Sequence, residues 1–336
     1  MRSVTTPFLT IALFVSLFAA VSDGQERVAS SDINRYRPYF IKQSDGDLKK
    51  DSIKVTFLGA TTLLFDDGES QLMLDGFFSR PSLISLIKNI ETDTKAVDAA
   101  LKRAKVDRLK ALFVAHSHYD HAFDVAYVIQ KTKAKLYGSS STLNVGRGGD
   151  LKDDQMVLFE AGKEFKVDQF SVTVLNSKHS PPIKGINDDL GQMIDKPLRQ
   201  PASARDYKEG GTYDFLIKHG DKAILVNSSN YFQDALNDVR ADVVFLGTGS
   251  LGNQTKAFQD AFYNQTIMKV RPKLVIPIHW DNFFRPLSDQ LEGMDNMNAS
   301  FDFLLDRLKT DKIEFGILQG YQSVRLFGKE SDVKKD

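Results

Sequence analysis

HSHYDH, residues 116–121, is the stretch of the chain that carries most of the information about its fold and chemistry. It follows the apolar run 112–115, LFVA, and opens onto a helix-like segment, 122–130. A polar, solvated turn is the alternative interpretation, since two histidines within three residues also occur by chance. Three histidines and an aspartate directly after a buried-looking strand favour a functional site, although the structural context must confirm such a motif.

The spacing of these side chains is suited to metal binding. In an extended chain, residues two apart project to the same side, so His116 and His118 can reach one point. Asp120 and His121 can turn toward a second point as the chain bends into the helix. Imidazole nitrogens and a carboxylate at this spacing suit a divalent metal of the zinc type. The run therefore predicts a metal-hydrolase active site.

Composition limits the class of protein. The chain has 336 residues, no cysteine, and 44 basic against 44 acidic side chains. This length allows about two domains, or one large layered α/β domain, and a core that needs no disulfide. Balanced, interspersed charges provide no basic surface for nucleic acid, so nucleic-acid binding is not expected.

The N-terminus predicts export. Arg2 precedes an apolar run, 8–21, and small residues follow at 20, 22 and 24. This run is short for a spanning helix, which needs about 20 residues, and it fits the apolar region of a signal peptide at 1–24. An uncleaved membrane anchor is the alternative. We expect a periplasmic or secreted protein with no stable membrane anchor after cleavage.

The rest of the chain divides into a polar N-terminal extension, 25–51, one domain, 52–328, and a charged tail, 329–336. Strands are predicted at 53–59, 62–65, 71–74, 112–115, 135–137, 156–159, 170–175, 213–218, 222–227, 243–247 and 274–278. Helices are predicted at 83–89, 97–104, 122–130, 256–270 and 301–308. This pattern favours an α+β fold in which two β-sheets pack together and are covered by helices.

Three further histidines can be placed from the strands that precede them. His179 and His279 each follow a predicted strand, at the strand–loop junctions where functional side chains usually lie. Each alone is more often structural, but their position beside a run with too few ligands for two metals favours a ligand role. His219 belongs to the turn of a predicted hairpin and is expected at the surface.

A long irregular stretch, 180–212, begins directly after His179. It lacks a sustained apolar period, and a connection of this length is usually a lid or a disordered segment. We expect it to lie over the metal site without adding much to the core, with Tyr207 as an apolar contact for substrate.

At this point the pattern resembles the metallo-β-lactamase-fold hydrolase superfamily. The matching features are the H-x-H-x-D-H run, His179, His279 and an acidic residue after an early hairpin, Asp75. The resemblance spans about 53–327 and implies an αββα sandwich of two mixed sheets. It further implies that one metal is bound by His116, His118 and His179, and the other by Asp120, His121 and His279.

One feature of that family is missing. Many members have an aspartate that bridges both metals, and the corresponding segment here, 224–230, contains no carboxylate. Ser229 is expected to take its place, so hydroxide alone bridges the metals or the second site is weak. Asp75 and Asp124 are expected to orient metal-bound imidazoles. The cofactor is expected to be one or two Zn²⁺ ions, with Mn²⁺ or Fe²⁺ as alternatives.

The expected activity is hydrolysis of an ester, lactone, amide or phosphodiester. Water bound to zinc ionises near neutrality, against a pKa of about 15.7 for bulk water, and becomes the nucleophile. Asp120 is the expected catalytic carboxylate. Segments 58–62, 179–182 and 277–281 resemble most the branch of ascorbate-6-phosphate lactonases and N-acylphosphatidylethanolamine phospholipases, which implies a small-molecule or lipid-derived substrate. A periplasmic β-lactamase and a non-catalytic metal- or ligand-binding protein of the same fold are the alternatives.

Overall fold

The computed structural model describes residues 31–43, 48, 52–182 and 188–327. The predicted signal peptide and charged tail therefore lie outside the described residues. Within the described part of the chain, no helix is both long enough and apolar enough to cross a membrane.

The first sheet is built mainly from the N-terminal half of the chain. It is antiparallel from β14 to β3 and parallel from β3 to β6. Its strands, in spatial order, are β14 (Ser323–Leu326), β1 (Ile53–Phe57), β2 (Leu63–Asp66), β3 (Gln71–Leu74), β4 (Leu109–Phe113), β5 (Lys135–Gly138) and β6 (Met156–Leu158).

The second sheet has the same mixed character. It is parallel from β13 to β10 and antiparallel from β10 to β7. Its strands, in spatial order, are β13 (Glu314–Phe315), β12 (Leu274–Ile278), β11 (Val243–Gly247), β10 (Lys222–Asn227), β9 (Thr212–His219), β8 (Phe170–Ser177) and β7 (Glu164–Val167).

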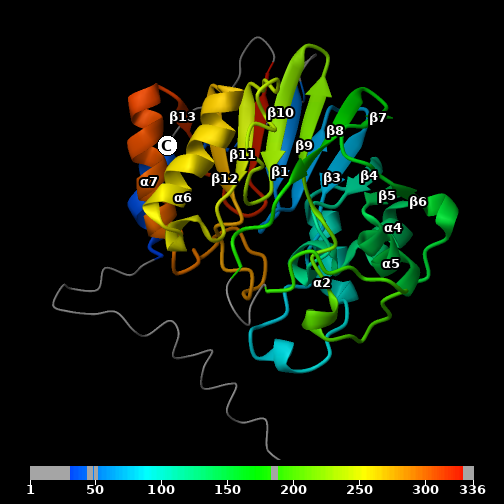
Figure 1. The fold of residues 1–336 in the computed structure, drawn as a ribbon. Coiled ribbons are helices and arrows are strands. Elements are labelled where there is room, and N and C mark those ends of the chain that lie inside the picture. The colour runs from blue at the N-terminus through cyan, green and yellow to red at the C-terminus, as the bar shows by residue number, and fades with distance from the viewer. Residues whose placement is uncertain (1–30, 44–47, 49–51, 183–187, 328–336) are drawn as a thin grey trace, which may run out of the picture.

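Helices cover the outer face of each sheet (Figure 1). On the first sheet lie α2 (Thr94–Arg103), α4 (Val125–Thr132) and α5 (Ser140–Gly148), and on the second lie α6 (Lys256–Tyr263) and α7 (Met297–Asp311). The one-turn helix α3 (Tyr119–Ala122) precedes α4. The predicted αββα sandwich of two mixed sheets is therefore confirmed.

Apolar side chains between the layers hold the sandwich together. All five residues of β11 and all five of β12 are buried, as is typical of parallel strands covered on both faces. Between the sheets, the ring of Phe65 meets that of Phe245 edge-on, with 6.2 Å between the centroids. Each such buried aromatic contributes on the order of 2–3 kcal/mol through removal of its surface from water.

Part of the predicted polar extension packs against the domain. A 3₁₀ helix, η1 (Ile33–Tyr39), begins at Asp32, whose side chain accepts a hydrogen bond from the Asn34 backbone N–H. Tyr36 is 2% exposed, lies edge-on to Phe301 and donates a hydrogen bond to Asp302 at 2.8 Å. These contacts fix η1 against α7.

Two helix expectations differ from the structure. Residues 83–89 do not form a regular helix but contain only the 3₁₀ turn η2 (Ser85–Ile87), and Ile84 is 79% exposed. The apolar residues of this segment therefore face solvent. Conversely, the sequence does not predict α5, because its two glycines lower helix propensity. Tertiary packing explains why glycine is needed at position 148, since a Cβ on Gly148 would collide with the Leu198 backbone.

Candidate metal centre

The HSHYDH run lies where β4 ends and α3 begins, at one edge of the sandwich. The Ser117 backbone N–H donates to the Glu209 carbonyl at 2.8 Å, and His118 is the N-cap residue that directly precedes α3. Asp120 and His121 belong to α3 itself. The strand fixes one part of the run and the helix the other, as the alternation in the sequence predicts.

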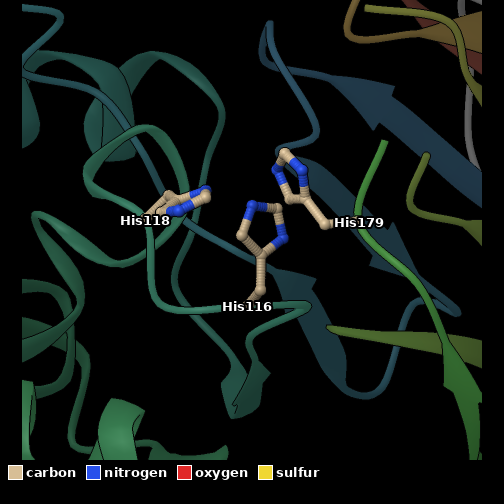
Figure 2. Close-up of side chains that lie close together, drawn as sticks. All are labelled: His116, His118 and His179. Atoms are coloured by element: carbon tan, nitrogen blue, oxygen red, sulfur yellow. The ribbon is translucent and has the colours of Figure 1, made fainter. Parts of the chain in front are cut away.

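His116, His118 and His179 form the first cluster. One ligand atom of each lies within 4.8 Å of those of the other two. His179 follows β8 of the second sheet, and Figure 2 shows the three rings turned toward one region. The cluster therefore joins the two sheets.

Asp120, His121 and His279 form a second cluster, with the same 4.8 Å limit between ligand atoms. His279 follows β12 directly and has a left-handed backbone, with φ of 58°. Its N–H donates to the Ala60 carbonyl at 2.6 Å, which holds this unfavourable conformation. The rings of His116 and His121 are 3.7 Å apart, centroid to centroid, so the two clusters share a wall.

Burial and mutual proximity keep three of these donors in the protonation states that metals require. Burial lowers the pKa of His116 well below its usual value, and the neighbouring His121 lowers it further. Burial also lowers the pKa of His179, to about 3. For Asp120, burial opposes ionisation, but His121 and His279 outweigh it and lower its pKa. His116 and His179 are thereby kept neutral and Asp120 ionised, the states in which these groups bind metals, whereas Asp120 outweighs burial at His279 and raises its pKa.

Buried nitrogens without hydrogen-bond partners show that the residues fit a metal. Both ring nitrogens of His116, Nε2 of His121 and Nδ1 of His279 are buried and unpartnered among the described residues. Buried polar atoms are normally satisfied, and the few that are not call for an explanation such as an ion. The donor set, five imidazoles and one carboxylate, suits zinc or iron better than magnesium or calcium.

Asp75 contacts one of these histidines, as predicted. Asp75 Oδ2 lies 2.9 Å from His121 Nδ1 and is also hydrogen-bonded by Thr61 Oγ1. Its other oxygen accepts from the Ala115 N–H at 2.8 Å. Asp75 is thus fixed at both oxygens and sets the orientation of the His121 ring, leaving Nε2 free for the cluster.

Asp124 has a different role from the one expected. It is fully buried, and it accepts hydrogen bonds from the Phe78 and Ser79 N–H groups at 2.7 Å each, and from Ser79 Oγ at 2.6 Å. Both oxygens are occupied by the loop after β3, and none of these hydrogen-bond partners is an imidazole. Asp124 orients that loop and does not orient a histidine.

Ser229 is also placed differently. Its hydroxyl accepts from the Ser180 N–H at 3.1 Å and so holds the turn after His179. Ser228 is the serine that lines a small cavity, together with Thr61 and Asp75, and its buried hydroxyl has no partner among the described residues. Ser228 therefore lies beside Asp75 and Thr61, which contact His121, whereas Ser229 lies beside the turn after His179.

The segment after His179 contributes to the core, contrary to expectation. Tyr207 is 1% exposed, packs edge-on against Phe123 at 5.6 Å and accepts a hydrogen bond from Gln200. Ile194 and Ala202 are buried beside it. Tyr207 is therefore a core residue of the first sheet's helical layer, and the few apolar residues of 188–212 are enough to fix the segment there.

Two groups of residues at the centre are not indicated by the sequence. Asp189 Oδ1 lies 3.0 Å from His118 Nε2. Arg80 forms a fully buried ion pair with Asp281, two residues after His279, and Asp281 accepts from the Ala60 N–H at 2.8 Å. These residues lie far from their partners in sequence, so no local pattern indicates them.

His219 is less exposed than predicted. It is the last residue of β9 and does not belong to the turn, and its side chain is 17% exposed. Its Nε2 lies 3.4 Å from Asp67, and its ring packs against Phe170. It remains outside both metal clusters.

An open cavity of about 460 Å³ adjoins the first cluster. Its volume is within the range of small-molecule sites. The residues that line it are Asn176, Ser177, Lys178, His179, Pro181, Pro182, Leu190, Glu209, Gly211, Thr212, Tyr213, Asn230 and Phe232.

Comparison with known proteins agrees with this geometry. Residues 55–200 match the model of the Metallo-beta-lactamase superfamily. A UPF0173 metal-dependent hydrolase of Roseiflexus castenholzii is 26% identical over 194 residues, 56% of this chain and 72% of the relative. One of Staphylococcus aureus is 26% identical over 240 residues, 71% of this chain and 89% of the relative.

Solved structures share the fold at low sequence identity. The metallo-β-lactamase-fold protein YhfI of Bacillus subtilis is 14% identical with a TM-score of 0.53, covering 82% of this chain and 100% of its own. CmlA, a diiron β-hydroxylase of Streptomyces venezuelae, is 14% identical with a TM-score of 0.52. The match covers 84% of this chain and 55% of CmlA. The matched model over residues 55–200, the relatives and the shared αββα sandwich make this chain similar to proteins of the metallo-β-lactamase superfamily and support that assignment.

Proposed function

We propose that this protein is a metal-dependent hydrolase acting on an ester, lactone or phosphodiester. The observation that carries the proposal is the pair of adjoining clusters, His116–His118–His179 and Asp120–His121–His279, at a cavity edge. The names of the curated relatives, metal-dependent hydrolases, support the same reaction class.

In the proposed site, each cluster would hold one divalent ion. Such ions activate water as a nucleophile and polarise the oxygen of the bond that is attacked. Asp120, whose pKa is held low by His121 and His279 against the effect of burial, stays ionised and could accept a hydrogen bond from the water as it is deprotonated. Asp75 keeps His121 in one orientation. The chain supplies no carboxylate at the turn 227–230, which contains Ser228 and Ser229.

Zinc is the metal proposed, with one or two ions bound and with Mn²⁺ or Fe²⁺ as alternatives. Histidine-rich sites with one carboxylate accept both zinc and iron. The diiron CmlA, which shares this fold, supports keeping iron among the candidates.

A small-molecule or lipid-derived substrate is proposed. The cavity beside His179 has the size for such a ligand, and Leu190 and Phe232 in its wall are 38% and 39% exposed. Lys178 Nζ lies 4.6 Å from the Phe232 ring centroid, which places a cation in the same wall. Apolar and cationic groups together suit an anionic substrate with an apolar part.

The test is turnover of a panel by the mature protein loaded in turn with Zn²⁺, Mn²⁺ and Fe²⁺. The panel contains carboxylic esters, lactones, phosphodiesters and β-lactams. His116→Ala should abolish turnover, whereas His219→Ala, a histidine outside both clusters, should leave it unchanged. Equal activity in the wild type and His116→Ala would refute the assignment.

The panel also decides between the alternatives. Turnover confined to β-lactams would identify a β-lactamase. Metal binding without turnover of any member would favour a non-catalytic metal- or ligand-binding protein. Export to the periplasm or the medium is a further proposal, supported by the apolar run 8–21, and fractionation of the source cells tests it.

A further inference from the structure

We infer that Asp189 is a positioning residue that sets the orientation of His118 in the first cluster, and that the segment 188–211 holds Asp189 in place. The inference rests on the metal centre proposed above. Asp189 adds a carboxylate contact to one of the ligands, and it comes from a segment that belongs to neither sheet.

The geometry leaves one ring nitrogen of His118 for the cluster. Nε2 lies 3.0 Å from Asp189 Oδ1, and the two side chains are only 13% and 17% exposed. A carboxylate accepts hydrogen bonds only, so Nε2 must carry the proton. Nδ1 is then the unprotonated nitrogen, and it is the one available to a metal beside His116 and His179.

A second buried carboxylate fixes the position of Asp189. Glu209, 7% exposed, accepts from the Gly191 N–H at 2.6 Å through one oxygen. Its other oxygen accepts from Thr212 Oγ1, on β9, at 2.7 Å. The turn that carries Asp189 is therefore tied to the second sheet.

The same segment also holds the backbone of the histidine run. The Glu209 carbonyl accepts from the N–H of Ser117, the residue between His116 and His118, at 2.8 Å. The backbone beside His118 and the ring of His118 are thus both held by one segment. Movement of that segment would release both contacts together.

The arrangement repeats that of the second cluster. There Asp75, at the end of β3, contacts His121 Nδ1 at 2.9 Å and leaves Nε2 for the metal. Each cluster therefore has one histidine fixed by a carboxylate, through opposite ring nitrogens. Loss of such a partner typically weakens metal affinity about 10- to 100-fold.

The experiment compares Asp189→Ala and Asp189→Asn with Asp195→Ala, which removes an exposed aspartate of the same segment. Nitrogen NMR of the metal-free, ¹⁵N-histidine-labelled protein reports the tautomer of His118. We expect the Nε2–H form in the wild type, in Asp189→Asn, whose amide oxygen can still accept, and in Asp195→Ala. In Asp189→Ala this form should be replaced by a mixture of the Nε2–H and Nδ1–H tautomers.

Titration with Co²⁺, followed by its absorption spectrum, gives a second readout. Asp189→Ala should weaken the first site about 10- to 100-fold and leave the second unchanged, whereas Asp189→Asn should lose less. An unchanged His118 tautomer and unchanged Co²⁺ affinity in Asp189→Ala would overturn the inference. Equal weakening of both sites would also overturn it, because it would show a general loss of structure.

These measurements do not depend on turnover. If the wild type hydrolyses nothing in the panel but the tautomer and the first-site affinity still respond to Asp189→Ala, the proposed function fails and the inference stands.

Discussion

Asp120 has two proposed roles, in metal binding and in proton transfer. Its Oδ2 lies 3.3 Å from His279 Nε2, and it is the carboxylate member of the second cluster. An amide of the same shape would keep the packing but lose the charge that both roles need.

Asp120→Asn should therefore leave the fold intact and reduce turnover by about 10²- to 10⁴-fold, the range typical of a lost acid–base group. It should also lower the metal content from two ions toward one. Far-UV circular dichroism, metal analysis and turnover measure these three effects. Full activity with unchanged metal content would exclude both proposed roles of Asp120.

Asp214 gives a residue-scale prediction about pH. It is buried on β9 and accepts hydrogen bonds from the Ser228 N–H and Asn227 Nδ2 at 2.9 Å each. Burial raises its pKa to about 7, against about 3.9 in an unfolded chain. Between about pH 4 and 7 the unfolded state thus loses a proton that the folded state keeps. The contribution of Asp214 to stability is present at about pH 4 and falls as the pH rises through 7.

Asp214→Asn cannot ionise and should lack this pH dependence. The free energy of unfolding of the variant, minus that of the wild type, should rise with pH by up to about 1.4 kcal/mol per unit between about pH 4 and 7, then level off. Thermal unfolding of both proteins at pH 5, 6, 7 and 8 measures the difference. A constant offset across this range would show that Asp214 does not titrate there.

For single residues, the sequence indicates the metal-ligand candidates better than it indicates the residues that hydrogen-bond to them. His179 and His279 could be selected because each follows a predicted strand. The placement of Asp189 against His118, and of Arg80 against Asp281, depends on segments that meet only in three dimensions. The different surroundings of Ser228 and Ser229 also depend on how the turn is folded, which the hydrogen bond from the Ser228 N–H to Asp214 helps to fix.

At the scale of elements, the segment 188–211 is fixed to the histidine run by close backbone contact. Gly210 has φ of +68°, and its N–H donates to the Gln192 carbonyl at 3.0 Å. A Cβ at this position would lie 2.6 Å from Ser117 Oγ and would also collide with Ser141. Glycine is required here for both its left-handed backbone and its lack of a side chain.

Gly210→Ala should destabilise the protein more than Gly162→Ala. Gly162 has φ of +84°, but no atom lies within 4 Å of the added Cβ. Both variants bear the left-handed penalty of about 1–2 kcal/mol, and only Gly210→Ala adds about 1–3 kcal/mol of overpacking. Thermal unfolding and Co²⁺ titration compare them, with weaker first-site binding expected in Gly210→Ala alone. Equal effects of the two variants would show that the contact with Ser117 is not tight.

Strands were easier to predict than helices. Runs such as 243–247 and 274–278 are apolar throughout and match β11 and β12 at both ends. The 83–89 segment has apolar residues that suggest a helix, but no described residue packs against Ile84 or Ile87 closely enough to bury them. In α5 the opposite holds, because contacts with 194–198 stabilise a helix whose own sequence does not favour one.

For the whole molecule, the predicted αββα architecture is correct because two mixed sheets are the arrangement that buries this many short apolar strands. The centre lies across the two sheets, with His116 and His118 after β4 of the first, and His179 and His279 after β8 and β12 of the second. A bound metal would therefore link the halves of the sandwich.

Removal of the metal should lower the temperature of unfolding. A ligand present at about 1,000 times its dissociation constant stabilises the folded state by about 4.1 kcal/mol. Calorimetry with and without a chelator, followed by return of the metal, measures this contribution. His219→Ala should respond as the wild type does. An unfolding temperature that is insensitive to the chelator, in protein shown to bind the ion, would mean that the metal does not link the sheets.

The pairing of β14 with β1, in which Leu326 lies opposite Ile53, has a consequence for biosynthesis. A ribosome releases the N-terminal strand long before its neighbour is translated, and the last histidine, His279, also emerges late. The nascent polypeptide can complete its first sheet only once β14 has been translated, and its second cluster only once His279 has. Until β14 pairs with it, β1 exposes an edge that a chaperone could cover.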